Sequence, residues 1–295
     1  MLSCSLSPAA AVLPLVNRCG TIGKVNPNTH TAGHKVKDHA DGESRLIPRS
    51  RRLVWDLMYF NRHVPLCGHD RSMNLTALDA ARQSGDGVRI SWPALIAKAY
   101  GLVAQDFPAL RRTWYRWPIA HTYQHPFSVA SVAVHREYKN EPWVFWGLIE
   151  SPETMSLPDI QEKMTEFQEN IPGAVFRPQL KLTSWPTPLR RLIWGWNLAV
   201  AKKMRAKRFG TFFLSTLGSR GVEIQVPPSV HTGCLTFGPL STTGDCRVTL
   251  AYDHRIMDGV YVADCLAALE SHLSDSILKE VLDLRDENPN ITEAA

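Results

Sequence analysis

The sequence predicts a mixed α/β fold in which helices cover a large mixed β-sheet. Three observations support this prediction. Segments 127–135 and 143–149 are rich in β-forming residues and are expected to pair as strands. Segments 91–105 and 156–169 have helical periodicity, and each begins with a serine that can cap a helix. Near the C-terminus, the alternating pattern of 246–253 leads directly into a helical pattern.

The other elements follow from the same periodicities. Helices are expected at 51–62, 74–81 and 189–204, a strand at 63–70, and a glycine-rich turn at 84–87. With 295 residues, 44% of them hydrophobic, the chain can bury one large core. No apolar run reaches the roughly 20 residues of a membrane span.

The domain boundaries follow from composition. The first 16 residues are apolar but lack the basic start of a signal peptide, and 17–46 are polar. We therefore expect a disordered segment at 1–46, one folded domain at 47–285 and a flexible tail at 286–295. The six cysteines form no Cys-x-x-Cys pair and no metal-binding pattern. This usage favours the reducing cytoplasm and predicts no metal site.

His254 is the most informative residue of the chain. It follows a predicted strand, has Asp258 four positions later, and is followed by Gly259, which lets the chain turn. A histidine held in this way is suited to act as a general base, although most His–Asp pairs in proteins are structural.

The string Asp253-His254-Arg255-x-x-Asp258-Gly259 resembles the signature of the chloramphenicol acetyltransferase-like superfamily. It is most similar to the catalytic core of the dihydrolipoyl acyltransferases of 2-oxo acid dehydrogenase complexes. Residues 209–218 resemble a second motif of that family, and the resemblance extends over about 47–275. It implies a two-layer sandwich with a large mixed sheet, acyl transfer, and a homotrimer with active sites between subunits.

The resemblance also implies roles for individual residues. His254 would be the base, and the Ser215 hydroxyl would stabilise the oxyanion. Asp258 would form a structural ion pair with an arginine, for which Arg51 and Arg52 are the candidates. Transfer would be direct, without an acyl-enzyme, from a thioester of coenzyme A as co-substrate or from a carrier protein. No metal is implied, and no lipoyl group is expected on this chain.

The sequence departs from the family pattern near the substrate. Thr216 replaces the usual asparagine, and the stretch from Ser215 to His254 is shorter than in the complex-forming enzymes. These departures argue against dihydrolipoamide as the acceptor. We therefore expect a stand-alone acyltransferase that acts on a small molecule or a lipid. The alternatives are a core subunit of a 2-oxo acid dehydrogenase complex and a non-catalytic scaffold of the same fold.

A basic segment forms the third departure. Residues 177–208 contain nine Lys and Arg, three Trp and no acidic residue, whereas the whole chain has a net charge of only +5. Three interpretations stay open: a helix with a solvated basic rim, contact of 185–208 with an anionic inner-membrane surface, or binding of donor phosphates. Lys202, Lys203 and Arg205 are the candidates for phosphate binding. No nucleic-acid recognition motif accompanies the charge, so nucleic acid is not expected.

Overall fold

The computed structural model describes residues 43–83 and 89–286. The chain divides into two units, 1–45 and 46–295, and all the helices and strands below belong to the second. The predictions for the N-terminal 42 residues, the turn at 84–87 and the tail after 286 lie outside the described residues. None of the described helices combines the length and hydropathy needed to cross a membrane.

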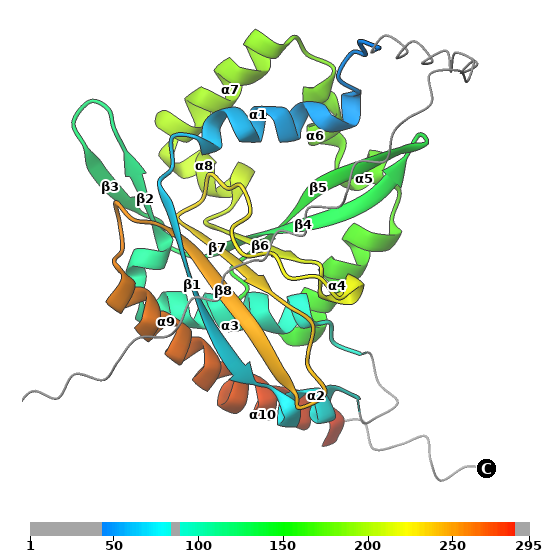
Figure 1. The fold of residues 1–295 in the computed structure, drawn as a ribbon, viewed down its shortest axis with the longest axis vertical. Helices are drawn as coiled ribbons and strands as arrows, with labels where there is room; N and C mark the ends of the chain where they lie inside the picture. Colours follow the sequence, from blue (N-terminus) through cyan, green and yellow to red (C-terminus); the bar gives the residue numbers. More distant parts are fainter. Residues whose placement is uncertain (1–42, 84–88, 287–295) are drawn as a thin grey trace, which may run out of the picture. The chain divides into compact units, whose positions relative to one another are not determined.

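The centre of the fold is a mixed sheet of six strands in the order β1-β8-β7-β6-β4-β5 (Figure 1). The strands are β1 (Leu66–Asn74), β4 (Val129–Tyr138), β5 (Glu141–Glu150), β6 (Phe212–Thr216), β7 (Gly233–Phe237) and β8 (Asp245–Asp253). Pairs β4–β6 and β6–β7 are parallel, and the other three pairs are antiparallel. The predicted mixed sheet and the predicted β4–β5 pairing are therefore confirmed. A separate hairpin joins β2 (Arg112–Tyr115) and β3 (His121–Gln124).

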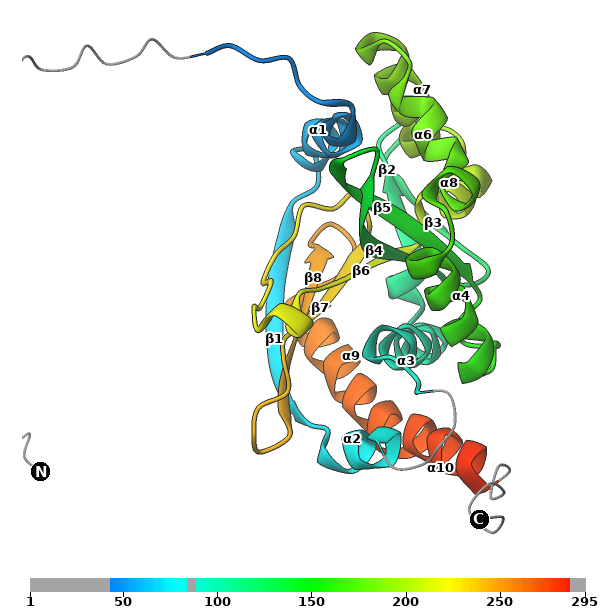
Figure 2. The same ribbon diagram turned by 90° about the vertical axis from the view of Figure 1, so that its right-hand side faces the viewer.

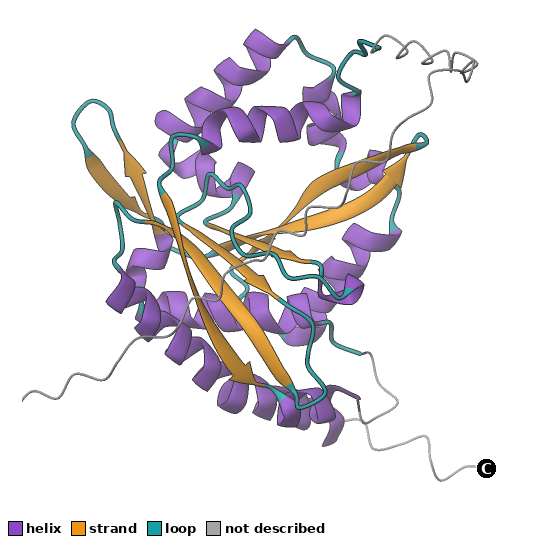
Figure 3. Cartoon of the chain, viewed as in Figure 1, coloured by secondary structure: helices purple, strands orange, loops and turns teal. Residues whose placement is uncertain are grey.

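The main core lies between one face of this sheet and a layer of helices (Figure 3). These helices are α2 (Thr76–Gln83), α3 (Trp92–Asp106), α4 (Leu157–Glu169), α9 (Gly259–His272) and α10 (Leu278–Asp286). Leu95 and Leu266 from the helices pack in one cluster with Phe212, Leu214 and Leu250 from the strands. Alternation along a strand sends every second side chain into this core, so Phe213 and Ser215 project from the opposite face.

That opposite face carries a second group of helices. They are α1 (Arg52–Asn61), α7 (Thr187–Ala199) and α8 (Lys202–Phe209). Helices α5 (Pro172–Val175) and α6 (Arg177–Thr183) follow α4 beside the edge strand β5, where Phe176 and Leu180 join the main core. A smaller cluster of Leu53, Leu57, Trp194 and Val230 holds α1 and α7 together. Figures 1 and 2 show α1 and α7 at the end of this unit opposite α2 and α10.

Two predicted elements differ from the structure. The strand expected at 63–70 is β1 at Leu66–Asn74, because the main chain at His63 and Val64 still turns back onto α1. The helix expected at 189–204 is two helices, α7 and α8, with a break at 200–201. Arg205 of α8 explains the break, since its guanidinium donates to the carbonyls of Leu198 (2.9 Å) and Val230 (2.7 Å).

Candidate active site

His254 lies in an ordered turn directly after strand β8. Its main-chain N–H donates to the carbonyl of Pro65 at 3.2 Å, and the N–H of Ile256 donates back to the carbonyl of Asp253 at 3.0 Å. The imidazole is exposed, and its ring centroid lies 5.5 Å from that of Tyr252. Within the described residues, no other group hydrogen-bonds the imidazole. A fixed backbone therefore presents a ring that is free to exchange a proton.

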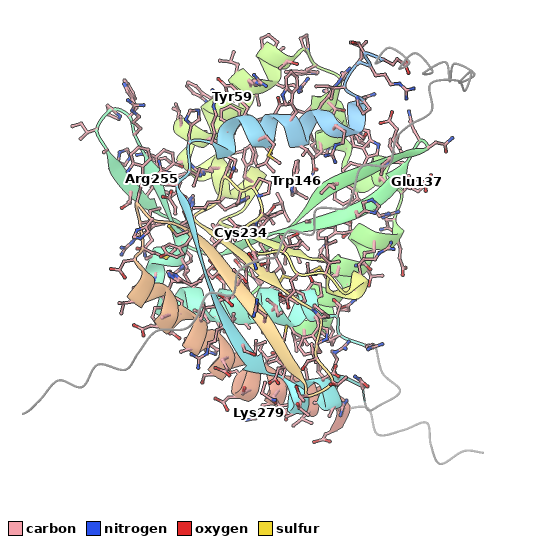
Figure 4. All side chains as sticks on the ribbon, in the orientation of Figure 1. Tyr59, Glu137, Trp146, Cys234, Arg255 and Lys279 are labelled. Atoms are coloured by element: carbon pink, nitrogen blue, oxygen red, sulfur yellow. The ribbon has the colours of Figure 1, made fainter. Side chains whose placement is uncertain are left out.

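Asp253 and Arg255 fix the shape of this turn. The Arg255 guanidinium donates to both carboxylate oxygens of the buried Asp253, at 2.8 and 2.6 Å. The same guanidinium lies 4.1 Å over the ring of Trp114 in β2. Figure 4 shows Arg255 beside the β2–β3 hairpin. Asp253 and Arg255 therefore stabilise the loop. The β2–β3 hairpin, which hydrophobic periodicity did not predict, supports the Arg255 guanidinium.

Asp258 caps a helix. Its carboxylate accepts a hydrogen bond from the main-chain N–H of Tyr261 at 3.0 Å, at the start of α9. The predicted ion pair with Arg51 or Arg52 is wrong within the described chain, where Arg52 instead donates to the Thr183 carbonyl at 3.0 Å. The first N–H groups of a helix have no hydrogen-bond partner inside the helix. Asp258 directly precedes α9, so its carboxylate accepts from one of these groups and needs no distant partner.

Gly259 is required for close approach. A Cβ atom at this position would lie 3.1 Å from Cε1 of His69, so a larger residue would displace the His69 ring. The His69 ring stacks on Tyr252, with centroids 5.4 Å apart. His69 is thus a second histidine beside the His254 turn. Sequence reasoning missed it, because the register of β1 on β8 is what brings it there.

Ser215 lies on β6, half-buried, on the sheet face that Phe213 also occupies. The next residue, Thr216, holds the end of this strand. Its hydroxyl donates to the carbonyl of Phe237 at 2.9 Å and accepts from the N–H of Gly218 at 3.0 Å. The threonine in place of the family's asparagine therefore has a structural task of its own.

One chain does not bring Ser215 and His254 together. Ser215 is paired across the sheet with Thr236, and Thr236 with Thr249. His254 is five residues further along the chain than Thr249, and β7 lies between β6 and β8, so these two strands are two strand spacings apart. At about 3.3 Å per residue and 4.8 Å per strand, the two residues are on the order of 20 Å apart.

Two other histidines are excluded as bases by their surroundings. His125 and His231 are buried, and burial lowers the pKa of each to about 4. The His231 Nε2–H donates to the Phe209 carbonyl at 2.6 Å, and its Nδ1 accepts from the Ser229 hydroxyl at 2.9 Å. Both nitrogens are therefore occupied, and the ring stays neutral near pH 7.

The basic segment separates into structural and exposed cations. Arg190 is buried and donates to both oxygens of buried Asp56 on α1, at 2.7 and 3.2 Å. Arg205 is tied to two main-chain carbonyls, so it is not free to bind a phosphate. Of the three phosphate candidates, Lys202 lies over the rings of Tyr115 and Tyr123, and only Lys203 is exposed.

The exposed side of α7 is apolar. Leu192 is 68% and Trp196 60% exposed, and Leu189 and Val200 extend the same surface. Residues three and four apart lie on one helix face, so these side chains form a continuous stripe. The predicted apolar side of this segment is therefore present, but it faces away from the core.

Comparison with known proteins shows which fold this is. The sequence matches no protein-family model and no curated protein. Its structure matches a probable dihydrolipoamide acetyltransferase from Listeria monocytogenes, with a TM-score of 0.56, 17% identity, and coverage of 84% of this chain and 97% of that chain. It also matches a truncated catalytic core of the 2-oxoacid dehydrogenase multienzyme complex from Thermoplasma acidophilum, with a TM-score of 0.57, 16% identity, and coverage of 79% and 99%.

A third match is the dihydrolipoamide acetyltransferase of Azotobacter vinelandii, with a TM-score of 0.59, 19% identity, and coverage of 80% of this chain and 95% of that chain. That structure concerns the role of a serine, a histidine and, four residues after the histidine, an asparagine in the catalytic mechanism. These matches confirm the predicted fold class. The chain has the fold of the dihydrolipoamide acetyltransferase catalytic core.

Proposed function

We propose that this protein is a stand-alone acyltransferase that moves an acyl group from a thioester donor to a small-molecule or lipid acceptor. The observation that carries the proposal is the exposed His254 imidazole on a turn fixed by Asp253 and Arg255. Such a ring can reach an acceptor and take its proton.

The proposed reaction is a direct transfer. His254 takes the proton from the acceptor hydroxyl, thiol or amine as that atom bonds to the thioester carbonyl carbon. The carbonyl oxygen becomes an oxyanion, to which the Ser215 hydroxyl donates a hydrogen bond. The carbon–sulfur bond then breaks, and the proton on His254 passes to the departing thiolate. The acylated acceptor and a free thiol are the products.

We further propose that the active unit is a homotrimer in which His254 of one copy faces Ser215 of the next. The separation of the two residues within one chain supports this, since neither site is complete alone. The edge strand β1 also supports it, because the six consecutive residues from Cys67 to Ser72 are all exposed and available to a second copy.

The Azotobacter enzyme supports the assignment of roles. Its mechanism involves a serine, a histidine and an asparagine four residues after the histidine. Ser215 and His254 occupy the positions expected for the first two, and Asp258 stands four residues after His254. Because Asp258 caps α9, we assign it the task of holding the turn and not that of moving protons.

Donor phosphates and a lipid surface are the proposed partners of the basic segment. The exposed Lys203 and the neighbouring exposed Lys207 and Arg208 supply positive charge, and the α7 stripe supplies exposed Trp196. A tryptophan on an apolar stripe flanked by cations suits the boundary between water and anionic lipid. The acceptor would then be a lipid or a molecule at its surface.

The test is incubation of the purified protein with acyl-coenzyme A and extracts of candidate acceptors, followed by mass spectrometry. Acylated products with equimolar free thiol support an acyltransferase, and their absence with every donor favours a scaffold. Light scattering distinguishes the stand-alone enzyme from a dehydrogenase-complex core. A large cubic or icosahedral particle indicates the complex core, and a trimer indicates the stand-alone enzyme.

A further inference from the structure

A cavity of about 710 Å³ lies between the sheet and the helices of its second layer, and Phe167 of α4 also lines it, beside the edge strand β5. Its floor is one row of residues in register across three strands: Leu148 on β5, Ser131 on β4 and Phe213 on β6. Its roof includes Leu57 of α1 and Ile193 of α7. Figure 4 shows Trp146, another wall residue, between α1 and the β4–β5 pair.

The cavity is partly open to solvent, and its size is typical of a ligand site and not of a packing defect. Protein cores are packed to the density of organic crystals, whereas ligand sites span roughly 300–1,000 Å³ with mostly apolar walls. The helices above the cavity are firmly anchored, so the cavity does not result from loose packing of these helices on the sheet. Buried Arg190 of α7 pairs with Asp56 of α1, and Gln179 of α6 bonds both the N–H and the carbonyl of Trp146 at the sheet edge.

Much of the wall offers little to a polar ligand, because several of its polar groups already have partners. Asn197 donates to the Ile193 carbonyl at 2.7 Å and accepts from Arg208 at 2.8 Å. His231 is occupied at both nitrogens. An exception among the described residues is the indole N–H of Trp194, which is buried without an acceptor. A hydrocarbon chain suits these walls, since it asks for no hydrogen bonds.

The cavity also lies beside the candidate oxyanion donor. Phe213 forms part of the floor, and Ser215 is two residues further along β6 on the same face. Two residues of a strand span about 7 Å. The distance from a carbonyl group at Ser215 to the cavity wall at Phe213 is therefore only a few methylene groups. A chain attached to that carbonyl would enter the cavity past Phe213.

We propose that this cavity binds the hydrocarbon chain of the acyl group, so that the donor is a fatty acyl thioester and not an acetyl thioester. The inference rests on the proposed function for the reaction, but binding of the chain does not depend on transfer. The rim carries Lys207, which is exposed and has no partner among the described residues. Free dodecanoate can therefore serve as a binding probe, with its carboxylate at this cation.

Two residues on different helices give a matched pair of variants. Ile193→Trp places a larger side chain in the cavity wall, whereas Leu282→Trp makes a similar enlargement at an exposed residue of α10 that does not line it. Calorimetry with dodecanoate should show binding to the wild type and to Leu282→Trp, and binding weakened by roughly ten-fold or more in Ile193→Trp. Equal affinity in all three proteins, or no binding to the wild type, overturns the proposal.

Fluorescence gives a second measurement that does not need the enlarged variant to fold. A brominated dodecanoate should quench the tryptophan emission, and Trp146→Phe should remove part of the quenched signal. Trp117→Phe, at an exposed residue outside the cavity, should remove none of it. Identical quenching in both variants contradicts the site.

Chain-length dependence separates this inference from the proposed function. Transfer from dodecanoyl-coenzyme A should exceed transfer from acetyl-coenzyme A, and Ile193→Trp should reverse that preference. Transfer without any preference for long chains leaves the proposed function intact and overturns the cavity proposal. Dodecanoate binding that follows the variant pattern without transfer from any donor supports the cavity proposal and overturns the proposed function.

Discussion

Ser215 and His254 lie on the order of 20 Å apart in one chain, although both belong to motifs expected at one active site. Strand register fixes this separation, because Ser215 is level with Thr249 and not with the end of β8. A base and an oxyanion donor must both touch the reacting carbonyl, so a single chain does not form the proposed site. The account therefore depends on a second copy.

Mixed trimers test this dependence. Co-expression of His254→Ala with Ser215→Ala should give trimers in which some interfaces combine an intact serine with an intact histidine. Random mixing predicts that roughly a quarter of the sites are intact. Turnover of the mixture should therefore exceed that of either variant alone. A mixture no more active than its better parent would contradict a shared site.

Asp258 should tolerate asparagine better than alanine. Asparagine caps a helix about as well as aspartate does, whereas alanine costs about 1 kcal/mol of unfolding free energy. Denaturant unfolding of Asp258→Asn should therefore match the wild type, and Asp258→Ala should be less stable by about that amount. A large loss of stability in Asp258→Asn would instead point to an ion pair that needs the charge.

The stability of the protein should fall as the pH drops below 6.5, in part because of His231. Burial lowers its pKa to about 4 in the folded protein, against an ordinary value of 6.5 in the unfolded chain. The folded state thus favours the neutral ring, and the stabilisation is present above pH 6.5 and lost as the pH falls toward 4. The loss from this residue is on the order of 3 kcal/mol at pH 4. His231→Gln should show a smaller pH dependence in chemical denaturation than the wild type.

The exposed stripe of α7 should bind anionic vesicles. Trp196→Ser and Leu192→Ser remove apolar surface at residues that are 60% and 68% exposed, so their folds should be unchanged. Co-sedimentation with phosphatidylglycerol vesicles should fall in both variants. Trp117→Ser, at 73% exposure in the β2–β3 turn, is the control and should bind like the wild type. Lys203→Gln should reduce the salt sensitivity of binding. Unchanged binding in all four variants would show that the stripe has another role.

Periodicity predicts the elements of this fold that carry strong local patterns. The helix after Ser156 and the β4–β5 pair lie where their patterns place them, and the Ser156 hydroxyl accepts from the Asp159 N–H as a cap. The break between α7 and α8 was not predictable from pattern, because apolar and basic residues continue through it. Tertiary contacts of Arg205 create that break.

The candidate site shows the same division between local and long-range information. His254 and its turn could be predicted, since the strand, the histidine and Asp258 are adjacent in sequence. His69, by contrast, reaches the turn only through pairing between β1 and β8, which are far apart in the chain. The capping role of Asp258 could be predicted from its place directly before a helix. The family resemblance instead favoured an ion pair, which the structure does not form.

The turnover of His254→Ala with a fatty acyl-coenzyme A tests the central claim most directly. The side chain is exposed and its imidazole has no hydrogen-bond partner among the described residues, so the variant should keep its melting temperature and its oligomeric state. Thiol release coupled to acceptor acylation should fall by about 10²–10⁴-fold, the usual contribution of a general base. Near-normal turnover in a correctly folded His254→Ala protein would contradict the account.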